Sequence, residues 1–171
     1  MEPRGKDYGN AMHAAMQYIH FERCGSVQGV EEELDRLLHA GFLKEDQRKV
    51  LSPGTIAAFF QTPLGRKLLE GTPYIREFKF SILDKGSNFR EGLEDEQVLL
   101  QGVVDCALLE DDGITVIDFK TDRVTKENAS EAAERYRMQV ETYAEALRRI
   151  YEKPIKKTCL YFFSISDFVE L

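Results

Sequence analysis

The sequence predicts an α/β domain in which helices pack against a sheet, with a helical N-terminal part before it. Three observations lead to this fold class. Apolar residues recur at helical spacing up to about Leu69, and from Tyr74 onward they form the alternating or continuous runs that are typical of strands. A second helical stretch near the C-terminus precedes one more apolar run. The predicted order of helices, three strands, a helix and a strand fits a sheet with helices packed against it.

The N-terminal part carries the signals of four helices. Two stripes of apolar residues at helical spacing predict the first two: Met12, Met16 and Ile19 in one, and Leu34, Leu37 and Leu38 in the other. Gly41 is expected to end the second helix. Ser52-Pro53 and Thr62-Pro63 each match an N-cap followed by proline at the first helical position. Two short helices are therefore expected to begin there.

The next segment is predicted to form three strands. Residues 74–83 alternate between apolar and polar side chains, and the polar stretch 87–96 is expected to be a loop. Residues 98–109 form a long apolar run, the sequence DDG at 111–113 suits a hairpin turn, and 114–120 is the returning strand.

Further along the chain, Ser130 is expected to cap a helix that runs to about Glu152. Residues 158–165 are then predicted to form a final buried strand. No internal repeat or low-complexity linker interrupts the sequence. We therefore expect one domain over residues 1–171, with a helical part at about 1–70 and an α/β core at about 71–171.

The composition is that of a globular protein, since 43% of the residues are apolar and 31% are charged. No apolar run approaches the roughly 20 residues that cross a bilayer. The first ten residues lack the apolar segment of a secretory signal. We therefore expect a soluble, cytoplasmic protein that does not contact a membrane.

Cysteine usage and net charge narrow the classes of function. Cys24, Cys106 and Cys159 are far apart and include no C-x-x-C pair, which argues for reduced thiols and against a zinc ribbon or an iron–sulfur cluster. The net charge of −7 argues against a protein that coats nucleic acid. It does not exclude a nuclease, because a magnesium site itself concentrates carboxylates.

The most informative stretch is the predicted hairpin LLQGVVDCALLEDDGITVIDFKTD at 99–122. Side chains alternate along a strand, so Asp118 and Lys120 should share one face while Phe119 points to the other. With the turn near residue 112, Asp105 and Asp118 fall close to opposite each other. We therefore expect two carboxylates and one ammonium group together at one edge of the sheet.

Two structural interpretations compete with a functional site here. The charges could form a buried Asp–Lys salt bridge, or they could lie on a solvated face of the sheet. As a site, two carboxylates suit a hard cation such as Mg²⁺, which activates water and polarises a phosphate. Lys120 could orient that water and offset the charge that grows on phosphorus. The spacing of the residues alone is equally compatible with a functional site and with a structural role.

Three motifs resemble those of the RecB-type branch of the PD-(D/E)xK nucleases. GVVD at 102–105 resembles the G-x-x-D motif, DFKT at 118–121 resembles D-[YF]-K-[TS], and QVETY at 139–143 resembles Q-x-x-x-Y. The resemblance implies that Asp105 and Asp118 bind metal and that Lys120 is catalytic. It also implies that Gln139 and Tyr143, four residues apart on one helix face, contact the site or the DNA.

Two upstream stretches extend the resemblance over nearly the whole chain. GNAMH at 9–13 resembles the G-x-x-x-H entry helix, which implies that His13 reaches the metal. REFKF at 76–80 resembles the strand that bears an early acidic residue, which implies that Glu77 belongs to the catalytic set. His20 and His39 have no such context, and we expect both to be structural or exposed.

Several neighbours of these motifs remain open at this point. Tyr136 lies three residues before Gln139 and should share its helix face. Asp122 could cap the following loop or hold Lys120. Arg123 and Lys126 could contact phosphate, although a solvated loop is the interpretation that we favour.

The resemblance implies a restriction-endonuclease-like mixed central sheet flanked by helices, and a metal-dependent DNA exonuclease. Mg²⁺ is the expected cofactor, and Mn²⁺ can substitute for it. The residues within and around the motifs are most similar to those of the AddA-type nuclease domains of bacterial helicase–nucleases. That likeness implies three partners, which are DNA, a helicase part and an AddB-type subunit. It also implies a role in the processing of double-strand ends for recombinational repair.

The sequence departs from a helicase–nuclease in one respect, because no G-x-x-x-x-G-K-[ST] phosphate loop occurs in it. We therefore expect either an excised domain or a free-standing relative. One alternative function is a catalytically silent module that keeps the nuclease fold for DNA binding or assembly. Another is a free-standing nuclease that acts on other nucleic acids.

Overall fold

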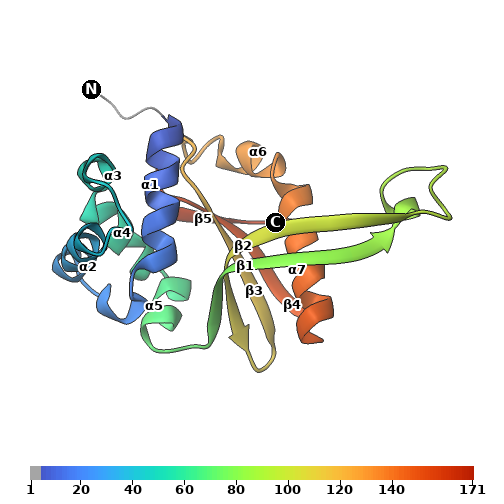
Figure 1. The fold of residues 1–171 in the computed structure, drawn as a ribbon, viewed down its shortest axis with the longest axis horizontal. Helices are drawn as coiled ribbons and strands as arrows, with labels where there is room; N and C mark the ends of the chain where they lie inside the picture. The colour runs from blue at the N-terminus through green and yellow to red at the C-terminus, as the bar shows by residue number, and fades with distance from the viewer. Residues whose placement is uncertain (1–4) are drawn as a thin grey trace.

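A five-stranded sheet separates two groups of helices (Figure 1). The computed structural model describes residues 5–171; Met1–Arg4, the start of the stretch considered above for a secretory signal, lie outside the described residues. The N-terminal group comprises α1 (Gly5–Tyr18), η1 (Phe21–Arg23), α2 (Val27–His39), α3 (Glu45–Val50), α4 (Pro53–Phe60) and α5 (Pro63–Leu69). The second group comprises α6 (Ala129–Glu134) and α7 (Arg137–Tyr151). Among the described helices, none has both the length and the apolar character needed to cross a membrane.

The predicted helix signals of the N-terminal part are confirmed. The side chain of Ser52 accepts a hydrogen bond from the backbone of Thr55, and the side chain of Thr62 accepts one from Gly65. Gly41 adopts a φ of +80° just after α2, the left-handed conformation typical of a helix end. The short helix α3 was not predicted, because none of its six residues is buried and it shows no apolar stripe.

The sheet is mixed, as the family resemblance implied. Its strands lie in the order of the chain: β1 (Tyr74–Lys85), β2 (Gln97–Glu110), β3 (Gly113–Lys120), β4 (Ile155–Phe162) and β5 (Asp167–Glu170). Only β3 and β4 pair in parallel, and α6 and α7 form the crossover between them. The strand β3 is therefore the central strand. The expected grouping of charges lies where β3 ends, in the middle of the sheet and not on one of its two outer strands.

The predicted helix from Ser130 to Glu152 is broken in the structure. The helix α6 ends at Glu134, and α7 begins only at Arg137. Ser130 does not cap a helix, because α6 already begins at Ala129. At the break, Tyr136 has φ −104° and ψ −2°, well away from the ideal helical values of about −63° and −42°, and its hydroxyl bonds to Asp122. No proline or glycine marks this break in the sequence, so the periodicity did not reveal it.

The predicted last strand at 158–165 is β4, which begins and ends three residues earlier, and a further strand that was not predicted follows it. The chain pairs with β3 from Ile155 to Phe162, turns, and returns as β5 from Asp167 to Glu170. Ser166 has a φ of +50° in this turn. Ser166 and Asp167 are common turn residues, but no glycine or proline lies in this stretch, and the apolar residues up to Ile165 favoured a longer strand.

Two separate hydrophobic cores lie on the two faces of the sheet. The N-terminal helices enclose the first, in which Phe59 packs edge-on against Phe119 of β3 and Tyr161 of β4. The second lies under α6 and α7 and includes Val116 of β3 and Val140 of α7. Along β3, alternate side chains therefore enter different cores, as period-two alternation predicts.

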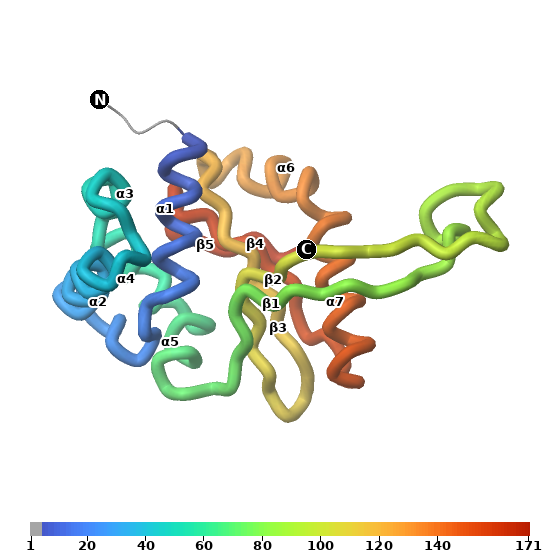
Figure 2. The backbone as a smooth tube through the Cα atoms, in the orientation of Figure 1, coloured from blue at the N-terminus to red at the C-terminus, as the bar shows by residue number. Residues whose placement is uncertain are grey.

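The outer halves of β1 and β2 project beyond the rest of the molecule as a two-stranded hairpin (Figure 2). Leu83 and Leu99 lie opposite each other on its exposed face. On the other face, Arg149 of α7 holds the hairpin, through the carbonyl oxygen of Leu83 at 3.2 Å and an ion pair with Asp84 at 3.2 Å. The tip of this hairpin includes η2 (Gly86–Asn88).

Gly102 of β2 lies where two aromatic side chains press against the strand. A Cβ atom at this position would lie 2.7 Å from Cε1 of Tyr143 and 2.9 Å from Cε1 of Phe80. Those two rings also pack edge to face, with their centroids 5.8 Å apart. The glycine of the G-x-x-D motif thus makes room for the tyrosine of the Q-x-x-x-Y motif.

Replacing Gly102 with alanine is expected to lower the free energy of unfolding by about 1–3 kcal/mol, the usual effect of overpacking a core. Urea unfolding measures this change. Gly54→Ala is the matched control, because its Cβ would meet only Oγ of Ser52 at 3.7 Å and alanine favours the helix. Equal stability of the two variants would contradict the packing argument.

Candidate active site

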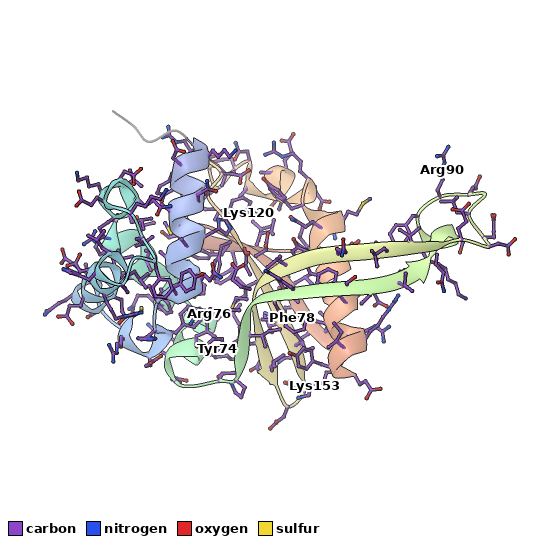
Figure 3. The ribbon with its side chains drawn as sticks, viewed as in Figure 1. Tyr74, Arg76, Phe78, Arg90, Lys120 and Lys153 are labelled. Atoms are coloured by element: carbon purple, nitrogen blue, oxygen red, sulfur yellow. The ribbon has the colours of Figure 1, made fainter. Side chains whose placement is uncertain are left out.

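The predicted charged residues converge at the C-terminal end of β3. Asp118 and Lys120 point to the α7 side of the sheet, while Phe119 enters the first core, as alternation predicted. Asp118 is almost fully buried, with 3% of its surface exposed. Figure 3 shows Lys120 in the middle of the molecule, between α1 and the α6–α7 layer.

Asp105 lies beside Asp118, as the predicted hairpin register required. The last paired residues of the hairpin are Cys106 and Ile117, so the next positions on the two strands are Asp105 and Asp118. One carboxylate oxygen of Asp105 accepts a hydrogen bond of 2.9 Å from the backbone N–H of Phe119. This bond fastens β2 to β3 at the point where the regular ladder ends.

Glu77 lies opposite Asp105, between the paired positions Arg76–Cys106 and Phe78–Val104. It has a φ of +47°, an uncommon conformation for a non-glycine residue that costs about 1–3 kcal/mol and clusters at functional sites. Burial and the neighbouring Asp105 carboxylate raise the pKa of Glu77.

The side chains of β1 and of β2 switch from one hydrophobic core to the other near Glu77 and Asp105. In β2, Val104 packs in the second core but Cys106 packs in the first, although strict alternation would place both on one face. In β1, Tyr74 packs against the first core and Phe78 against the second. The regular alternation of side chains is therefore interrupted at Glu77 and Asp105. Glu77, the third carboxylate, lies next to Asp105 at this interruption.

His13 reaches the site from α1, as the G-x-x-x-H resemblance implied. Its Nε2 atom lies 3.0 Å from the carbonyl oxygen of Phe119 and 3.4 Å from Oδ2 of Asp105, and Nδ1 lies 2.9 Å from the carbonyl oxygen of Gly9. Carbonyl oxygens only accept hydrogen bonds, so both ring nitrogens carry protons in this arrangement. The hydrogen bond to Asp105 raises the pKa of His13 to about 9, although burial opposes it.

The two central carboxyl groups have opposite pKa shifts. Burial and the neighbouring Asp105 carboxylate raise the pKa of Asp118 to about 7. Burial alone would also raise the pKa of Asp105, but the hydrogen bond with His13 and its other partners hold it below its ordinary value. Without a cation, the pair therefore tends to keep one proton.

Lys120 lies against Asp118 but does not satisfy it fully. Its Nζ atom is 2.6 Å from Oδ2 of Asp118, yet this buried oxygen has no donor in hydrogen-bonding geometry among residues 5–171. Nζ also lies 3.2 Å from Oε1 of Gln139, whose amide donates to the hydroxyl of Tyr143 at 2.8 Å. The Q-x-x-x-Y motif thus holds the lysine.

Tyr136 is a member of the site that sequence motifs did not assign a role. Its ring lies under the lysine, with Nζ of Lys120 3.8 Å from the ring centroid, which is cation–π contact. Its hydroxyl donates a 2.7 Å hydrogen bond to Asp122. Asp122 therefore holds Lys120 indirectly, through the tyrosine. Tyr136 makes this contact from the break between α6 and α7, and the sequence did not predict that break.

The other residues considered in the sequence lie outside this cluster. His20 is in contact with the buried Glu33 between α1 and α2, and the ring of His39 bonds to the carbonyl oxygen of Asp35 on the surface of α2. Lys126 is exposed in the loop before α6, as expected for a solvated position.

The oxygen atoms at this site fit a hard divalent cation. Asp105 and Asp118 supply carboxylates, Glu77 lies next to them, and Oδ2 of Asp118 is a buried acceptor without a donor among the described residues. Across residues 5–171, no three His, Cys, Asp or Glu side chains come close enough to surround an ion by themselves. Mg²⁺ usually keeps several water ligands, so it needs only one or two carboxylates from the protein.

Comparison with known families decides the class of protein. A family profile described as the PD-(D/E)XK nuclease superfamily matches residues 1–168. The chain belongs to this superfamily. The predicted restriction-endonuclease-like fold and the family resemblance are thereby confirmed, and the chain is related to nucleases that generally use divalent metal ions. The roles of individual residues stay predictions.

Curated relatives within the PD-(D/E)XK superfamily are much longer than this chain. The A subunit of the ATP-dependent helicase/nuclease of Bacillus cytotoxicus is 34% identical over 95% of this chain and 14% of its own length. The protein of the same name from Bacillus mycoides is 32% identical over 100% of this chain and 15% of its own length. The chain thus spans about a seventh of these relatives. The crystal structure of SSO0001 is 16% identical over 89% of this chain and 63% of that one, and its TM-score of 0.41 marks only a loose likeness.

The stability of the metal-free protein is expected to fall as pH rises from about 5 to 9. Asp118 has a pKa of about 7 in the fold against an ordinary value of 3.8, so the folded state binds its proton more tightly, and this contribution is lost as pH rises toward 7. His13, raised from 6.5 to about 9, extends the loss to higher pH. Thermal melts in EDTA measure the trend, in which about 1 kcal/mol corresponds to roughly 2–4 °C.

Asp118→Asn is the control for this profile, because it removes the carboxyl group and keeps its shape. The variant should show a flatter profile between pH 5 and 7 and should exceed the wild type in melting temperature at neutral pH. A structural salt bridge with Lys120 requires the reverse, since the variant would leave a buried ammonium without a counterion. A less stable variant at neutral pH in EDTA would support that scaffold.

Proposed function

We propose that this chain is a metal-dependent DNA exonuclease domain of AddA type. The observation that carries the proposal is that Asp105, Asp118 and Lys120 lie together at the end of β3 in a member of this superfamily, with Glu77 next to Asp105. Glu77, Asp105 and Asp118 come from three neighbouring strands, and Lys120 lies at the exit of the central one. Mg²⁺ is the proposed cofactor, with Mn²⁺ as a substitute.

The proposed chemistry is hydrolysis of a phosphodiester bond. A divalent cation bound by Asp105 and Asp118, with His13 as a further ligand, would polarise the phosphate and lower the pKa of a water molecule. The ammonium of Lys120, held by Gln139 and Tyr136, would orient that water and offset negative charge that grows on the phosphate. His13 must first release the proton on Nε2, so low pH should oppose metal binding.

The proposed setting is the processing of broken duplex ends for recombinational repair. Its support is the name of the curated relatives, which are helicase/nuclease subunits, and the chain spans only about a seventh of them. In this setting a helicase part would deliver DNA to the nuclease domain, and an AddB subunit would be the partner.

A catalytically silent module for DNA binding or assembly is the competing function. Such a module has no need for a buried carboxylate at Asp118 or for a lysine that Gln139 and Tyr136 hold in place. The intact set of acidic residues and lysine therefore favours catalysis.

Replacing Lys120 with alanine is expected to lower the rate of DNA cleavage by about 10²-fold or more, the scale on which loss of one key electrostatic group acts. Asp118→Ala should have an effect of similar size. The affinity for DNA should change much less in both. Gel assays on labelled single-stranded DNA measure the rate, and fluorescence anisotropy in EDTA measures the affinity.

Lys49→Ala is the matched control for loss of a lysine, because Lys49 is exposed on α3 away from the site. It should cleave and bind like the wild type. Normal cleavage by both the Lys120 and the Asp118 variants would refute the catalytic proposal and support the silent module.

Added Mg²⁺ is expected to raise the melting temperature of the wild type, because an ion that binds only the folded site stabilises it by mass action. At 100 times the dissociation constant this stabilisation is about 2.7 kcal/mol. Melts with EDTA and with Mg²⁺ at matched ionic strength measure the shift. Lys49→Ala should show the full shift, and Asp118→Asn should show little. Absence of a shift in the wild type would contradict the metal site.

A further inference from the structure

We propose that a cavity beside the active site binds one nucleobase of the DNA strand that is cleaved; this inference rests on the proposed function. The cavity has a volume of about 510 Å³. Its walls come from the start of α1, from the segment that follows β3 and from the turn after β4. The described residues that line it are Gly5, Tyr8, Thr121, Asp122, Arg123 and Ser164.

The cavity shares a wall with the catalytic cluster. Thr121 and Asp122 directly follow Lys120 in the chain. Across from them, α1 approaches so closely that a Cβ atom on Gly9 would lie 3.1 Å from Oγ1 of Thr121. The carbonyl oxygen of Gly9 is also the partner of Nδ1 of His13, one helical turn further along. A strand whose phosphate lies at His13 and Lys120 therefore has a neighbouring nucleotide within reach of the cavity.

The lining suits a flat, uncharged group with polar edges. Tyr8 is half-buried, and it packs against the first core while also lining the cavity. Neither its hydroxyl nor that of Thr121 has a hydrogen-bond partner within residues 5–171, so both are available to a ligand. An aromatic ring with adjacent hydroxyl groups offers a nucleobase a stacking surface and hydrogen bonds for its edge.

The charges of the lining argue for a base and against a phosphate group. Asp122 and Arg123 are the charged side chains among the described lining residues, and their formal charges cancel. The carboxylate of Asp122 would repel a phosphate. A neutral base meets no such repulsion, and every base has a face that can stack on Tyr8.

The floor of the cavity is held in shape by its own hydrogen bonds. The hydroxyl of Ser164 donates to the carbonyl oxygen of Asp122 at 2.9 Å and accepts from the backbone N–H of Val124 at 3.2 Å. These bonds join the turn after β4 to the segment after β3. The carboxylate of Asp122 is in turn fixed by the hydroxyl of Tyr136. A base would therefore enter a site that is largely preformed.

Equilibrium binding of a short single-stranded oligonucleotide in EDTA provides the first test, because no cleavage competes. Loss of the aromatic ring in Tyr8→Leu should weaken binding about 5- to 150-fold, which is the fold-change that corresponds to the usual loss of one base–aromatic stack. Tyr8→Leu keeps an apolar side chain against the core, so the fold should persist, and a thermal melt verifies it. Tyr8→Phe keeps the ring and should bind close to the wild type.

Tyr18→Leu is the matched control on the same helix. Tyr18 stacks on Phe42, with ring centroids 4.3 Å apart, at the opposite end of α1 from the cavity. This variant should bind DNA like the wild type. Equal affinity of Tyr8→Leu and the wild type would overturn the proposal.

Cleavage of oligonucleotides that each lack one base provides the second test. In the wild type, a missing base should depress cleavage at one bond at a fixed distance from it, because that bond is cut only when the base occupies the cavity. In Tyr8→Leu this position-specific dip should disappear. A wild type that cleaves DNA with no such dip would overturn the base site alone, whereas a wild type that cleaves no DNA would overturn the proposed function as well.

Discussion

The structure depends on one electrostatic constraint, which is the repulsion between the carboxylates of Asp105 and Asp118. The two groups lie side by side and are largely buried. Each carboxylate disfavours the ionised form of the other, and burial strengthens the effect. The surrounding chain offsets this repulsion with a lysine on one side and a protonated histidine on the other. The backbone N–H of Phe119 adds one more donor. The local fold is arranged around this pair of charges.

Several irregular features of the fold become understandable from this constraint. The left-handed conformation of Glu77 interrupts the regular pairing of β1 with β2 beside the charges. The break between α6 and α7 turns Tyr136 toward the ammonium of Lys120. Gly102 leaves room for Tyr143, which orients the amide that holds the same lysine. The first two depart from regular secondary structure close to the charges, and the third is a glycine at a regularly paired position of β2.

Short-range rules made the central part of the site predictable from the sequence. A tight turn and period-two alternation are enough to place Asp105 beside Asp118 and to put Lys120 on the same face. The position of β3 in the middle of the sheet could not be predicted in this way, because strand order depends on contacts between distant segments. The helix break was hidden for a different reason. No helix-breaking residue marks it, and it coincides with a tertiary contact, the hydrogen bond of Tyr136 to Asp122.

The position of the site between the two hydrophobic cores has a mechanical consequence. His13 belongs to the helical layer on one face of the sheet, and the amide that holds Lys120 belongs to the layer on the other. A ligand bound between them would act as a reversible crosslink between two packing units that lie on opposite faces of the sheet. Sliding of one layer relative to the other would separate these groups before it disturbed either core. The geometry of this charged cluster therefore depends on how the two layers are aligned.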